Sequence, residues 1–558
     1  MPTMSRLIST LILLPLLACG AVKHGGGDDD DDDGSDGADA GPVPEGKQRL
    51  TVTVTGDGAV TSDPAGIDCP DACTADFDEG TEVVLTPVAQ STTALAAWSG
   101  DCGAFDASCA VTMDDARSVD ATFGLHGSKR WVAQVSFEGQ DFIEHDVVLD
   151  PDGNPIIAGT VDNDDDEDGT PDGSDMYVAK YDKLTGDLLW ERLVDTTSGE
   201  YYGGLAVDAG GDVYAAMTIL GFDPITIDGD SYTPDLFGNM IVMRLARDTG
   251  DFVWVKQWGG GAQDRPHALV VQGSNLYVAG EISSSDADFD GIVVAGSTGD
   301  AVIVKARTDN GNATRVKLID GNLELNAIAA SASKLAVAGY FSGTPTIDAG
   351  CNISSSGSNS ADGFMLQLTP ADLDCEWSQD FGDSATDMSC AAKGVAAYPG
   401  GGWVVTGDFK GNVLFAASGS SLPSRGSFDA FAVRYAANGT HVWSFRYGDT
   451  GFDLGTAVAT TEYGSVILAG TFAADITFGG FDLSGANDVY LTRMSPGDAP
   501  SHEWAVALGG DSTDSPDSLA VTAEGYPYVL AYFNGMTTVD GQTMTALDYD
   551  AWLGAMIR

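Results

Sequence analysis

The chain has 558 residues, and 83 Asp and Glu against 26 Lys and Arg give it a formal net charge of −57 at neutral pH. Phosphate backbones repel so acidic a chain, which excludes nucleic acid as a partner. A hydrophobic content of 43 % with ten Trp excludes disorder throughout, and 71 Gly without a collagen period suit a turn-rich β protein.

The first 19 residues have the features of an export signal. An apolar run over residues 7–17 follows Arg6 and is too short to span a bilayer as a mature helix. It ends in Leu-Leu-Ala-Cys19, which resembles the lipobox of bacterial lipoproteins. The resemblance implies that Cys19 is lipidated and becomes the new N-terminus, and that Gly20 after it directs the protein to the outer membrane. We therefore expect an exported, lipid-anchored protein, the alternative being an ordinary secretory signal that is cut elsewhere.

Residues 20–48 are predicted to form a disordered acidic tether. They contain three consecutive Gly at 25–27 and six consecutive Asp at 28–33. Adjacent like charges repel one another and extend the chain, while Gly keeps it flexible. We interpret the segment as a solvated spacer that holds the folded part clear of the membrane. A calcium or partner site in the Asp run is the alternative.

Residues 49–125 are predicted to form a small β module. The stretch 50–55 alternates with period two, and further strands are expected at 82–88, 94–99, 110–113 and 118–123, between turns rich in Gly, Asp and Pro. The run from Pro64 through Trp98-Ser-Gly-Asp-Cys102 to Phe123 resembles the divergent bacterial surface repeat known as the InlB-type B-repeat. Modules of that family are spacers or adhesive stalk units, so the resemblance implies no catalysis.

The cysteines agree with export to an oxidising compartment. Four of them, an even set, lie in the small module: Cys69, Cys73, Cys102 and Cys109. Three pairings are possible, and the two local pairs are favoured because short loops align such thiols, with a zinc site as the alternative. The larger domain contains Cys351, Cys375 and Cys390. We expect a Cys351–Cys375 disulfide and a buried free thiol.

The rest of the chain, residues 129–558, is one sequence repeat. Each unit contains a strand opened by Asp or Asn, a polar turn with Gly and a strand centred on Trp, and two further strands separate successive pairs. The opening residues, 59 to 67 positions apart, are Asp175, Asn239, Asp300, Asp362, Asp429, Asp488 and Asp550. The Trp positions are Trp131, Trp190, Trp254, Trp377, Trp443 and Trp504, with Val316 in the missing place. Four short strands in each repeat are the signature of a β-propeller blade.

The two ends of this domain indicate a closed ring. Residues 129–137 resemble the last strand of a unit, and residues 550–558 resemble a third strand that lacks its fourth. Together they complete a seventh blade, and their pairing leaves no open sheet edge. The sequence therefore predicts an all-β fold, a seven-bladed propeller closed by pairing 129–137 with 548–557.

Two family resemblances accompany the repeat. The strings Asp-Val-Tyr, Ala-Gly and Ser427-Phe-Asp-Ala-Phe-Ala-Val433 are similar to the SBBP-type propeller repeats of bacterial surface and secreted proteins. The segment Asp182-Lys-Leu-Thr-Gly-Asp-Leu-Leu-Trp190 resembles the tryptophan-docking repeat of PQQ-type propellers. In that repeat Gly supplies a left-handed turn residue and Trp packs between blades. Neither resemblance transfers catalytic residues or a quinone site.

One loop has the composition of a metal site. Its carboxylates follow the pattern DxDxDGxxDxxD, which resembles the calcium loops of thrombospondin type 3 repeats and EF-hands: Asp164, Asp166, Asp168, Asp172 and Asp175. Alternating carboxylates surround one ion with hard oxygens, and Gly169 permits the sharp turn between them. Ca²⁺ is therefore the expected cofactor, with a solvated acidic loop as the alternative. The other six opening residues are interpreted as structural, accepting backbone N–H bonds at strand entry.

No catalytic residue is predicted. The six His are scattered, and no Gly-x-Ser-x-Gly, His-Glu-x-x-His or P-loop sequence occurs. His145 and His267 fall near predicted first strands, which line the channel of a propeller, and a packed or solvent-facing role is the simpler interpretation. We expect a monomeric binding or scaffolding protein, not an enzyme, whose loops at one face engage a protein or glycan. The alternatives are a lyase or glycosidase built in the channel, and an envelope-assembly scaffold resembling PQQ-type propeller lipoproteins.

Overall fold

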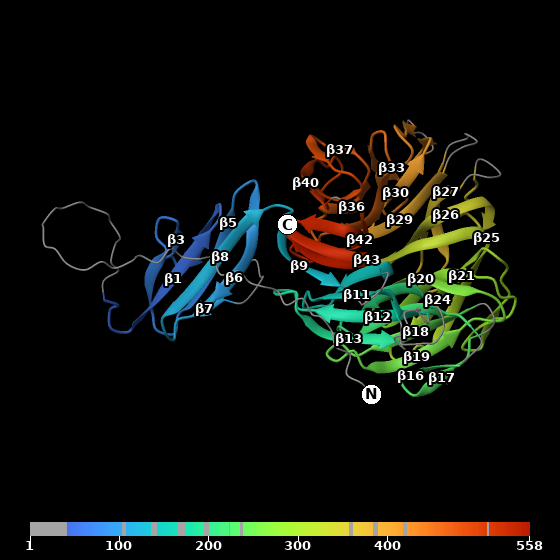
Figure 1. The fold of residues 1–558 in the computed structure, drawn as a ribbon, viewed down its shortest axis with the longest axis horizontal. Coiled ribbons are helices and arrows are strands. Elements are labelled where there is room, and N and C mark those ends of the chain that lie inside the picture. The colour runs from blue at the N-terminus through green and yellow to red at the C-terminus, as the bar shows by residue number, and fades with distance from the viewer. Residues whose placement is uncertain are drawn as a thin grey trace, which may run out of the picture.

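The computed structural model describes residues 42–102, 108–135, 142–163, 173–194, 200–221, 224–234, 238–355, 361–382, 389–416, 421–510 and 513–558. These ranges form strands, turns and irregular segments, so the predicted all-β class is confirmed for them. They hold no helix that is long and apolar enough to cross a membrane. Figure 1 shows a small module beside a larger body whose sheets surround a common centre.

The small module consists of two four-stranded sheets. The first has the order β4 (Thr74–Asp78), β1 (Lys47–Thr55), β8 (Arg117–Leu125), β6 (Thr93–Gly100), and the second β3 (Asp68–Cys69), β2 (Gly58–Asp63), β5 (Glu82–Ala89), β7 (Cys109–Thr112). Period-two alternation turns one face of each strand inward. Leu50 and Val119 are thereby buried in one cluster with Val83 and Trp98. The module contains three strands that the sequence analysis did not predict, β2, β3 and β4.

The larger body begins with two four-stranded antiparallel groups. The first is β10 (Phe142–Leu149), β11 (Pro155–Asn163), β12 (Gly173–Tyr181), β13 (Leu188–Val194), and the second is β14 (Glu200–Val207), β15 (Val213–Ile219), β18 (Asn239–Leu245), β19 (Phe252–Trp258). A seven-stranded sheet follows, made of β20 (Asp264–Gln272), β21 (Asn275–Ile282), β24 (Asp300–Arg307), β25 (Ala313–Ala330), β26 (Leu335–Thr346), β27 (Asp362–Leu368) and β28 (Cys375–Phe381). The 18-residue β25 ends one group with its first half and begins the next with its second half.

Three further four-stranded groups complete the body. They are β29 (Ser389–Ala397), β30 (Trp403–Lys410), β33 (Asp429–Tyr435), β34 (His441–Tyr447); β35 (Asp453–Thr460), β36 (Val466–Phe472), β39 (Asp488–Met494), β40 (His502–Leu508); and β41 (Asp514–Val521), β42 (Pro527–Val539), β43 (Gln542–Met556), β9 (Lys129–Val135). First strands contact one another in the closed order β10, β14, β20, β25, β29, β35, β41 and back to β10. Antiparallel sheets around such a cycle make a β-propeller, so the predicted propeller fold is confirmed.

The ring is closed by strands from the two ends of the domain. β43 pairs with β9 in antiparallel register, from Ala551 opposite Val135 to Ala555 opposite Trp131. The turn between these strands is rebuilt from two separate segments, since Ile557 N donates to Ser128 O and Gly127 N donates to Ile557 O, both at 2.8 Å. The unbroken turn after β12 has the same two bonds, at 2.8 and 2.9 Å. The predicted pairing of the two ends is confirmed.

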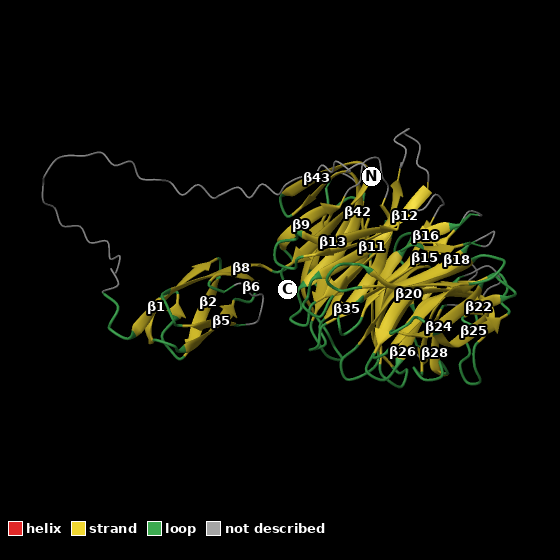
Figure 2. Cartoon of the chain, turned by 90° about the horizontal axis from the view of Figure 1, so that it is seen from below, coloured by secondary structure: helices red, strands yellow, loops and turns green. Residues whose placement is uncertain are grey.

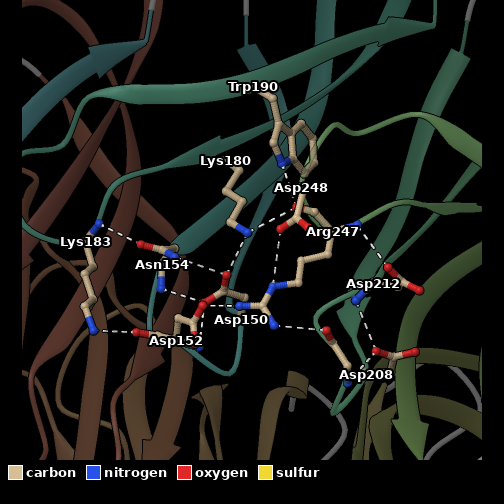
Figure 3. A network of polar contacts seen from close by, with 11 residues as sticks. Asp150, Asp152, Asn154, Lys180, Lys183, Trp190, Asp208, Asp212, Arg247 and Asp248 are labelled. Atoms are coloured by element: carbon tan, nitrogen blue, oxygen red, sulfur yellow. Dashed lines mark hydrogen bonds and ion pairs between the residues drawn. The ribbon is translucent and has the colours of Figure 1, made fainter.

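Docked Trp side chains hold neighbouring groups together at the turns between third and fourth strands. Trp190 Nε1 donates to Arg247 O of the next group at 2.9 Å, and a Cβ on Gly250, at φ +67°, would lie 2.6 Å from the Trp190 ring. Lys180 Nζ donates to the same carbonyl at 3.1 Å and forms a buried ion pair of 2.7 Å with Asp150 (Figure 3). Trp131, Trp254 and Trp377 dock in the same way on Lys183 O, Thr308 O and Ala437 O. The Trp-and-Gly packing expected from the sequence is therefore present.

The ring consequently has two different faces. The turn face holds the short connections from first to second and from third to fourth strands, with the docked Trp and the ion pairs of Figure 3. The loop face holds the connections from second to third and from fourth to first strands. Two-stranded hairpins occupy several of these connections in the described part of the chain: β16 (Ile225–Ile227) with β17 (Asp230–Tyr232), β22 (Ala287–Phe289) with β23 (Ile292–Val294), β31 (Asn412–Val413) with β32 (Leu422–Pro423), and β37 (Asp475–Phe478) with β38 (Phe481–Ser484).

The hairpins were not predicted from the repeat, and one of them shows what they do. β22 follows β21 in the chain and lies beside β19, the last strand of the preceding group, where Asp288 bridges Gly259 and Trp258 Nε1 donates to Asp290 at 3.2 Å. Covering a last strand protects a sheet edge from pairing with another chain. A signal was present in the sequence, because Asp-Gly pairs such as Asp228–Gly229, both at positive φ, form the tight turns of two-residue hairpins.

The small module packs against the end of the ring where β43 and β9 pair (Figure 2). Ile557 is 2 % exposed and packs with Ala94 and Ala96 of β6. Tyr526 Oη donates to Leu95 O at 2.7 Å, and its ring lies between two guanidinium groups, those of Arg130 at 4.8 Å and Arg558 at 5.3 Å. Module and ring therefore meet at the seam where the ring closes.

Three disulfides form the pairs favoured from the sequence. They are Cys69–Cys73, Cys102–Cys109 and Cys351–Cys375. Cys390 is a buried free thiol, as expected, and burial raises its pKa well above the ordinary value for cysteine. A thiol that stays protonated at neutral pH is a poor nucleophile, so Cys390 acts as a small apolar side chain of the core.

Candidate ligand site at the channel mouth

Every first strand of the ring contains a β-bulge near its loop-face end. The pairing of each first strand with its second strand skips one residue, three positions after the strand opens in β20, β35 and β41. The residues skipped around the ring are Glu144, Gly203, His267, Asn326, Lys393, Thr456 and Asp517. A bulge leaves its extra residue outside the ladder and re-aims its side chain.

The Ala-Gly pair of the repeat explains how the bulge fits in four of the seven groups. In β26, Gly339 lies opposite the bulge of β25, and a Cβ there would overlap the carbonyl oxygen of Glu324. Gly280, Gly407 and Gly470 stand in the same relation to the first strands of their own groups. The repeated Gly therefore makes room for the bulging backbone, and this role was not recognised from the sequence.

Polar bulge residues line the wall between neighbouring first strands. Asn326 Nδ2 donates to Ala392 O of β29 at 2.8 Å. Lys393 Nζ forms an ion pair of 2.5 Å with Asp408, and Asp517 of β41 forms an ion pair with His145 of β10. His145 and His267, singled out from the sequence, thus both lie on first strands, and His267 is itself a bulge residue.

Burial changes the acid–base state of two groups at this wall. It raises the pKa of Asp146 to about 6, against the opposing effect of a 2.9 Å hydrogen bond from Tyr202 Oη. It lowers the pKa of His267, although the carboxylates of Glu281 and Glu324 act to raise it. His267 is therefore a neutral imidazole at pH 7, able to accept one hydrogen bond and to donate another.

A small cavity opens between β14 and β20. It has a volume of about 40 Å³ and is lined by Tyr201, Tyr202, Thr218, Arg265, Pro266 and His267. The Arg265 guanidinium lies 4.7 Å from the centre of the Tyr201 ring, and its Nε is 3.9 Å from Glu281 Oε1. Next to it, Tyr340 Oη donates a hydrogen bond to Glu324. Residues of first and second strands thus lie close together at this cavity: an arginine, a neutral histidine, two carboxylates and an exposed tyrosine.

The opening residues of the third strands are buried structural groups. Asp300 accepts hydrogen bonds from Ser297 N at 2.8 Å and from Gly321 N at 2.9 Å, and Asp429 accepts one from Arg425 N at 2.9 Å. Asp264 at the start of β20 accepts four hydrogen bonds in the same manner, from Gly260, Ser283 and Ser284. First strands therefore have opening carboxylates of their own, which the sequence analysis did not identify.

The predicted calcium and lipid sites lie mostly beyond the described residues. Asp164, Asp166, Asp168, Asp172 and Cys19 all belong to undescribed ranges. Asp175 is described: it is 1 % exposed and lies in β12 opposite Val161. Across the described ranges, no group of three or more His, Cys, Asp or Glu side chains is placed to hold a metal ion.

Comparison with known proteins adds no family name. No protein-family model and no curated protein matches the chain. Among solved structures, the Dos1 propeller has 10 % identity and a TM-score of 0.35, covering 77 % of this chain and 95 % of its own. The Neurospora crassa Pan2 WD40 domain has 9 % identity and a TM-score of 0.39 (76 % and 95 % covered), and the quinohemoprotein alcohol dehydrogenase of Comamonas testosteroni has 9 % and 0.36 (76 % of each chain). At such scores the fold assignment rests on the strand topology.

Proposed function

We propose that this protein is a bacterial surface lipoprotein whose seven-bladed propeller binds a protein or glycan ligand at the loop-face mouth of its channel. The contrast between repeated and unrepeated positions supports it. Opening Asp residues and docked Trp recur around the ring and hold the fold. The bulge keeps its backbone geometry but changes its side chain in every group. Constant geometry with varied chemistry suits the recognition of one asymmetric ligand.

The proposal is tested by capture from envelope extract with the full chain as bait. A His267→Ala, Asn326→Ala double variant should lose most of the captured ligand, because both residues are bulge residues of the channel wall. Asp248→Ala is the matched control, since Asp248 lies on the turn face with its side chain 88 % exposed. Equal capture by all three proteins would show that the ligand does not use the channel mouth.

The remaining parts of the proposal concern how the ring is displayed. Cys19 would carry the lipid, residues 20–48 would be the tether, and residues 49–125 a spacer, all on the motifs of the sequence. The seven-blade count is supported by the closed order of first strands and by the shared β25. A Cys19→Ser variant should leave the membrane fraction, and retention there would contradict the lipid anchor. We propose a monomer without a nucleic-acid partner, as the charge of −57 favours.

Calcium binding by the loop of Asp164, Asp166, Asp168 and Asp172 is part of the proposal. The support is its spacing of carboxylates around Gly169, because seven neighbouring acids repel one another without a cation. Chelation should lower the midpoint of thermal unfolding by a few degrees in the natural protein. An Asp164→Asn, Asp166→Asn variant should show no response to chelator. Equal responses in both proteins would reject the site.

A channel enzyme is a second candidate, favoured by the group of Arg265, His267, Glu281 and Glu324. A neutral imidazole beside carboxylates is the equipment for proton transfer in a lyase or glycosidase. Cleavage of a captured polysaccharide, abolished by His267→Ala, would support it, and binding without cleavage would contradict it. An envelope-assembly scaffold remains the third candidate, for which barrel proteins should co-purify with the full chain.

A further inference from the structure

We propose that the cavity between β14 and β20 is a subsite for an uncharged, hydroxyl-rich ligand, a neutral oligosaccharide. The inference rests on the proposed function and names the ligand class of its site.

Two polar atoms of residues that line the cavity lack hydrogen-bond partners among the described residues. They are Thr218 Oγ1 and His267 Nε2, both buried, and both residues line the cavity. Thr218 is 1 % exposed, so bulk water does not reach its hydroxyl freely. A buried polar atom without a partner destabilises the protein, and this cost is offset when a water or a ligand group supplies the missing bond. The cavity is therefore shaped for a small polar group.

The size and bonding pattern of the cavity identify that group as a hydroxyl. A volume of about 40 Å³ has room for a few water molecules or one hydroxymethyl arm, and is too small for a sugar ring. A hydroxyl both donates and accepts, so it can bond to the acceptor nitrogen of a neutral His267 and to the hydroxyl of Thr218 together. A carboxylate has no hydrogen to donate to that nitrogen.

The surroundings offer a platform for the rest of the sugar. Tyr201 is 45 % exposed at the rim and stacks with Arg265. The pair presents the apolar ring face of Tyr201 and the planar array of donors of Arg265. Sugar C–H faces pack on aromatic rings, while their hydroxyls bond to carboxylates and guanidinium groups. Asn326 and Lys393 continue the polar wall along the next first strands, where further sugar units would lie.

The charges around this subsite disfavour an anionic ligand. Arg265 faces the carboxylate of Glu281, and Glu324 accepts a hydrogen bond from Tyr340, so no cation is left over to attract an anion. The net charge of −57 repels acidic chains before they arrive. A cationic group would have to displace Arg265 from Tyr201 and Glu281.

The test uses the full chain on an array of uncharged and acidic oligosaccharides, followed by titration calorimetry with the uncharged hits. Thr218→Val keeps the shape of the side chain and removes the hydroxyl. It should weaken binding at least tenfold, and Tyr201→Ala should do the same. Thr477→Val and Tyr463→Ala are matched controls, because Thr477 bonds to Asp482 on an outer hairpin and Tyr463 is 74 % exposed elsewhere; both should stay within twofold.

Stability gives an independent readout. Because Thr218 Oγ1 lacks a partner within the described chain, Thr218→Val should leave the unfolding midpoint of the free protein unchanged or raise it while binding is lost. The inference would be overturned if Thr218→Val lowers the unfolding midpoint, or if it leaves the binding of uncharged glycans intact. It would also be overturned if the protein binds only acidic glycans, or no uncharged glycan at all. Capture of a protein that depends on His267 and Asn326 would overturn it and leave the proposed function standing. Capture that depends on neither residue would overturn both.

Discussion

At the scale of single residues, residues of the same type have different structural roles at different positions of the repeat. The Gly of Ala-Gly is required by space: in β26 a Cβ on Gly339 would overlap the Glu324 carbonyl oxygen. The Gly of the third-to-fourth turn is required by conformation, since Gly250 has φ +67° beneath the Trp190 ring. Opening Asp residues are required by hydrogen bonding, as the contacts of Asp264 and Asp300 show.

The steric role of Gly339 predicts a large loss of stability in Gly339→Ala. The added methyl group cannot fit without moving the bulged backbone of β25, so the free energy of unfolding should fall by about 3 kcal/mol in urea denaturation. Gly261→Ala is the control, because the nearest atom to its Cβ would be Asp286 Oδ1 at 3.8 Å. Similar losses in the two variants would mean that the loss of glycine's backbone freedom, and not the bulge, explains the result.

The buried opening carboxylates predict a dependence of stability on pH. Burial raises the pKa of Asp514 to about 6 from 3.8, so the folded state holds the proton more tightly than the unfolded chain. The stability that this group contributes is fully present below pH 4 and is lost as the pH rises through 6, on the order of 2 kcal/mol. Asp146 and Asp550 act in the same direction, because burial raises the pKa of each to about 6.

Unfolding measured from pH 4 to 7 should therefore show a flatter profile in Asp514→Asn than in the natural protein. Asp309→Asn serves as the control, since the exposed Arg307–Asp309 pair lowers the pKa of that carboxyl and should not reproduce the flattening. A natural protein whose stability rises steadily over this range would contradict the assignment.

At the scale of elements, the blade junctions explain where the few cations are placed. Lys180, Arg244 and Lys305 all sit on third strands and donate to turn carbonyls of the next group, at 3.1, 2.9 and 2.9 Å. Trp190 and Trp254 donate to two of the same carbonyls. These three basic residues therefore hold neighbouring sheets together on the turn face. The side chains of the loop face are not needed for these contacts and differ from group to group.

Trp docking can be separated from Trp packing with two matched substitutions. Trp190→Phe loses the 2.9 Å hydrogen bond to Arg247 O, whereas Trp443→Phe loses an indole N–H that has no partner in the described part of the chain. Both side chains are buried to nearly the same degree, at 8 % and 7 % exposed. Trp190→Phe should therefore cost about 1–2 kcal/mol more in chemical denaturation. Equal costs would assign the role of Trp190 to packing alone.

At the scale of the whole molecule, the ring and the small module share the seam of closure. The split turn of Gly127, Ser128 and Ile557 repeats the bonds of an unbroken turn, and β6 covers it from outside. Closing a ring of non-local strands costs chain entropy, and contacts at the seam offset that cost. The module therefore stabilises the propeller.

This arrangement predicts that Ile557→Asp weakens the closure. A carboxylate placed between Ala94 and Ala96 is buried without a partner, so the free energy of unfolding should fall by about 3 kcal/mol and protease should cut between residues 125 and 129. Leu125→Asp is the control at the end of β8, next to the same seam, because Leu125 is 62 % exposed. If the Ile557→Asp variant resists protease as well as the control does, the contact between the module and the ring does not stabilise the closure.

Much of the fold could be predicted because propellers are built from local patterns. Strand alternation, Trp and Gly spacing and the two incomplete units at 129–137 and 550–558 are all visible along the chain, and they led to the closure that β9 and β43 make. Cys69–Cys73 and Cys102–Cys109 were predicted from proximity in sequence. The hairpin of Asp228 and Gly229 was missed because the search for a repeat averaged over the differences between units.

The sequence by itself determined the class of fold, the repeat and the joining of its ends, because each of these follows from periodicity and from residues close together in the chain. Only the tertiary structure decided which residues form the channel wall, since His267, Asn326, Lys393 and Asp517 are about 60 residues or more apart and share no motif. A bulge is a misfit between two paired strands, and neither strand alone encodes it. The cavity of Thr218 and His267 likewise exists only where two sheets meet.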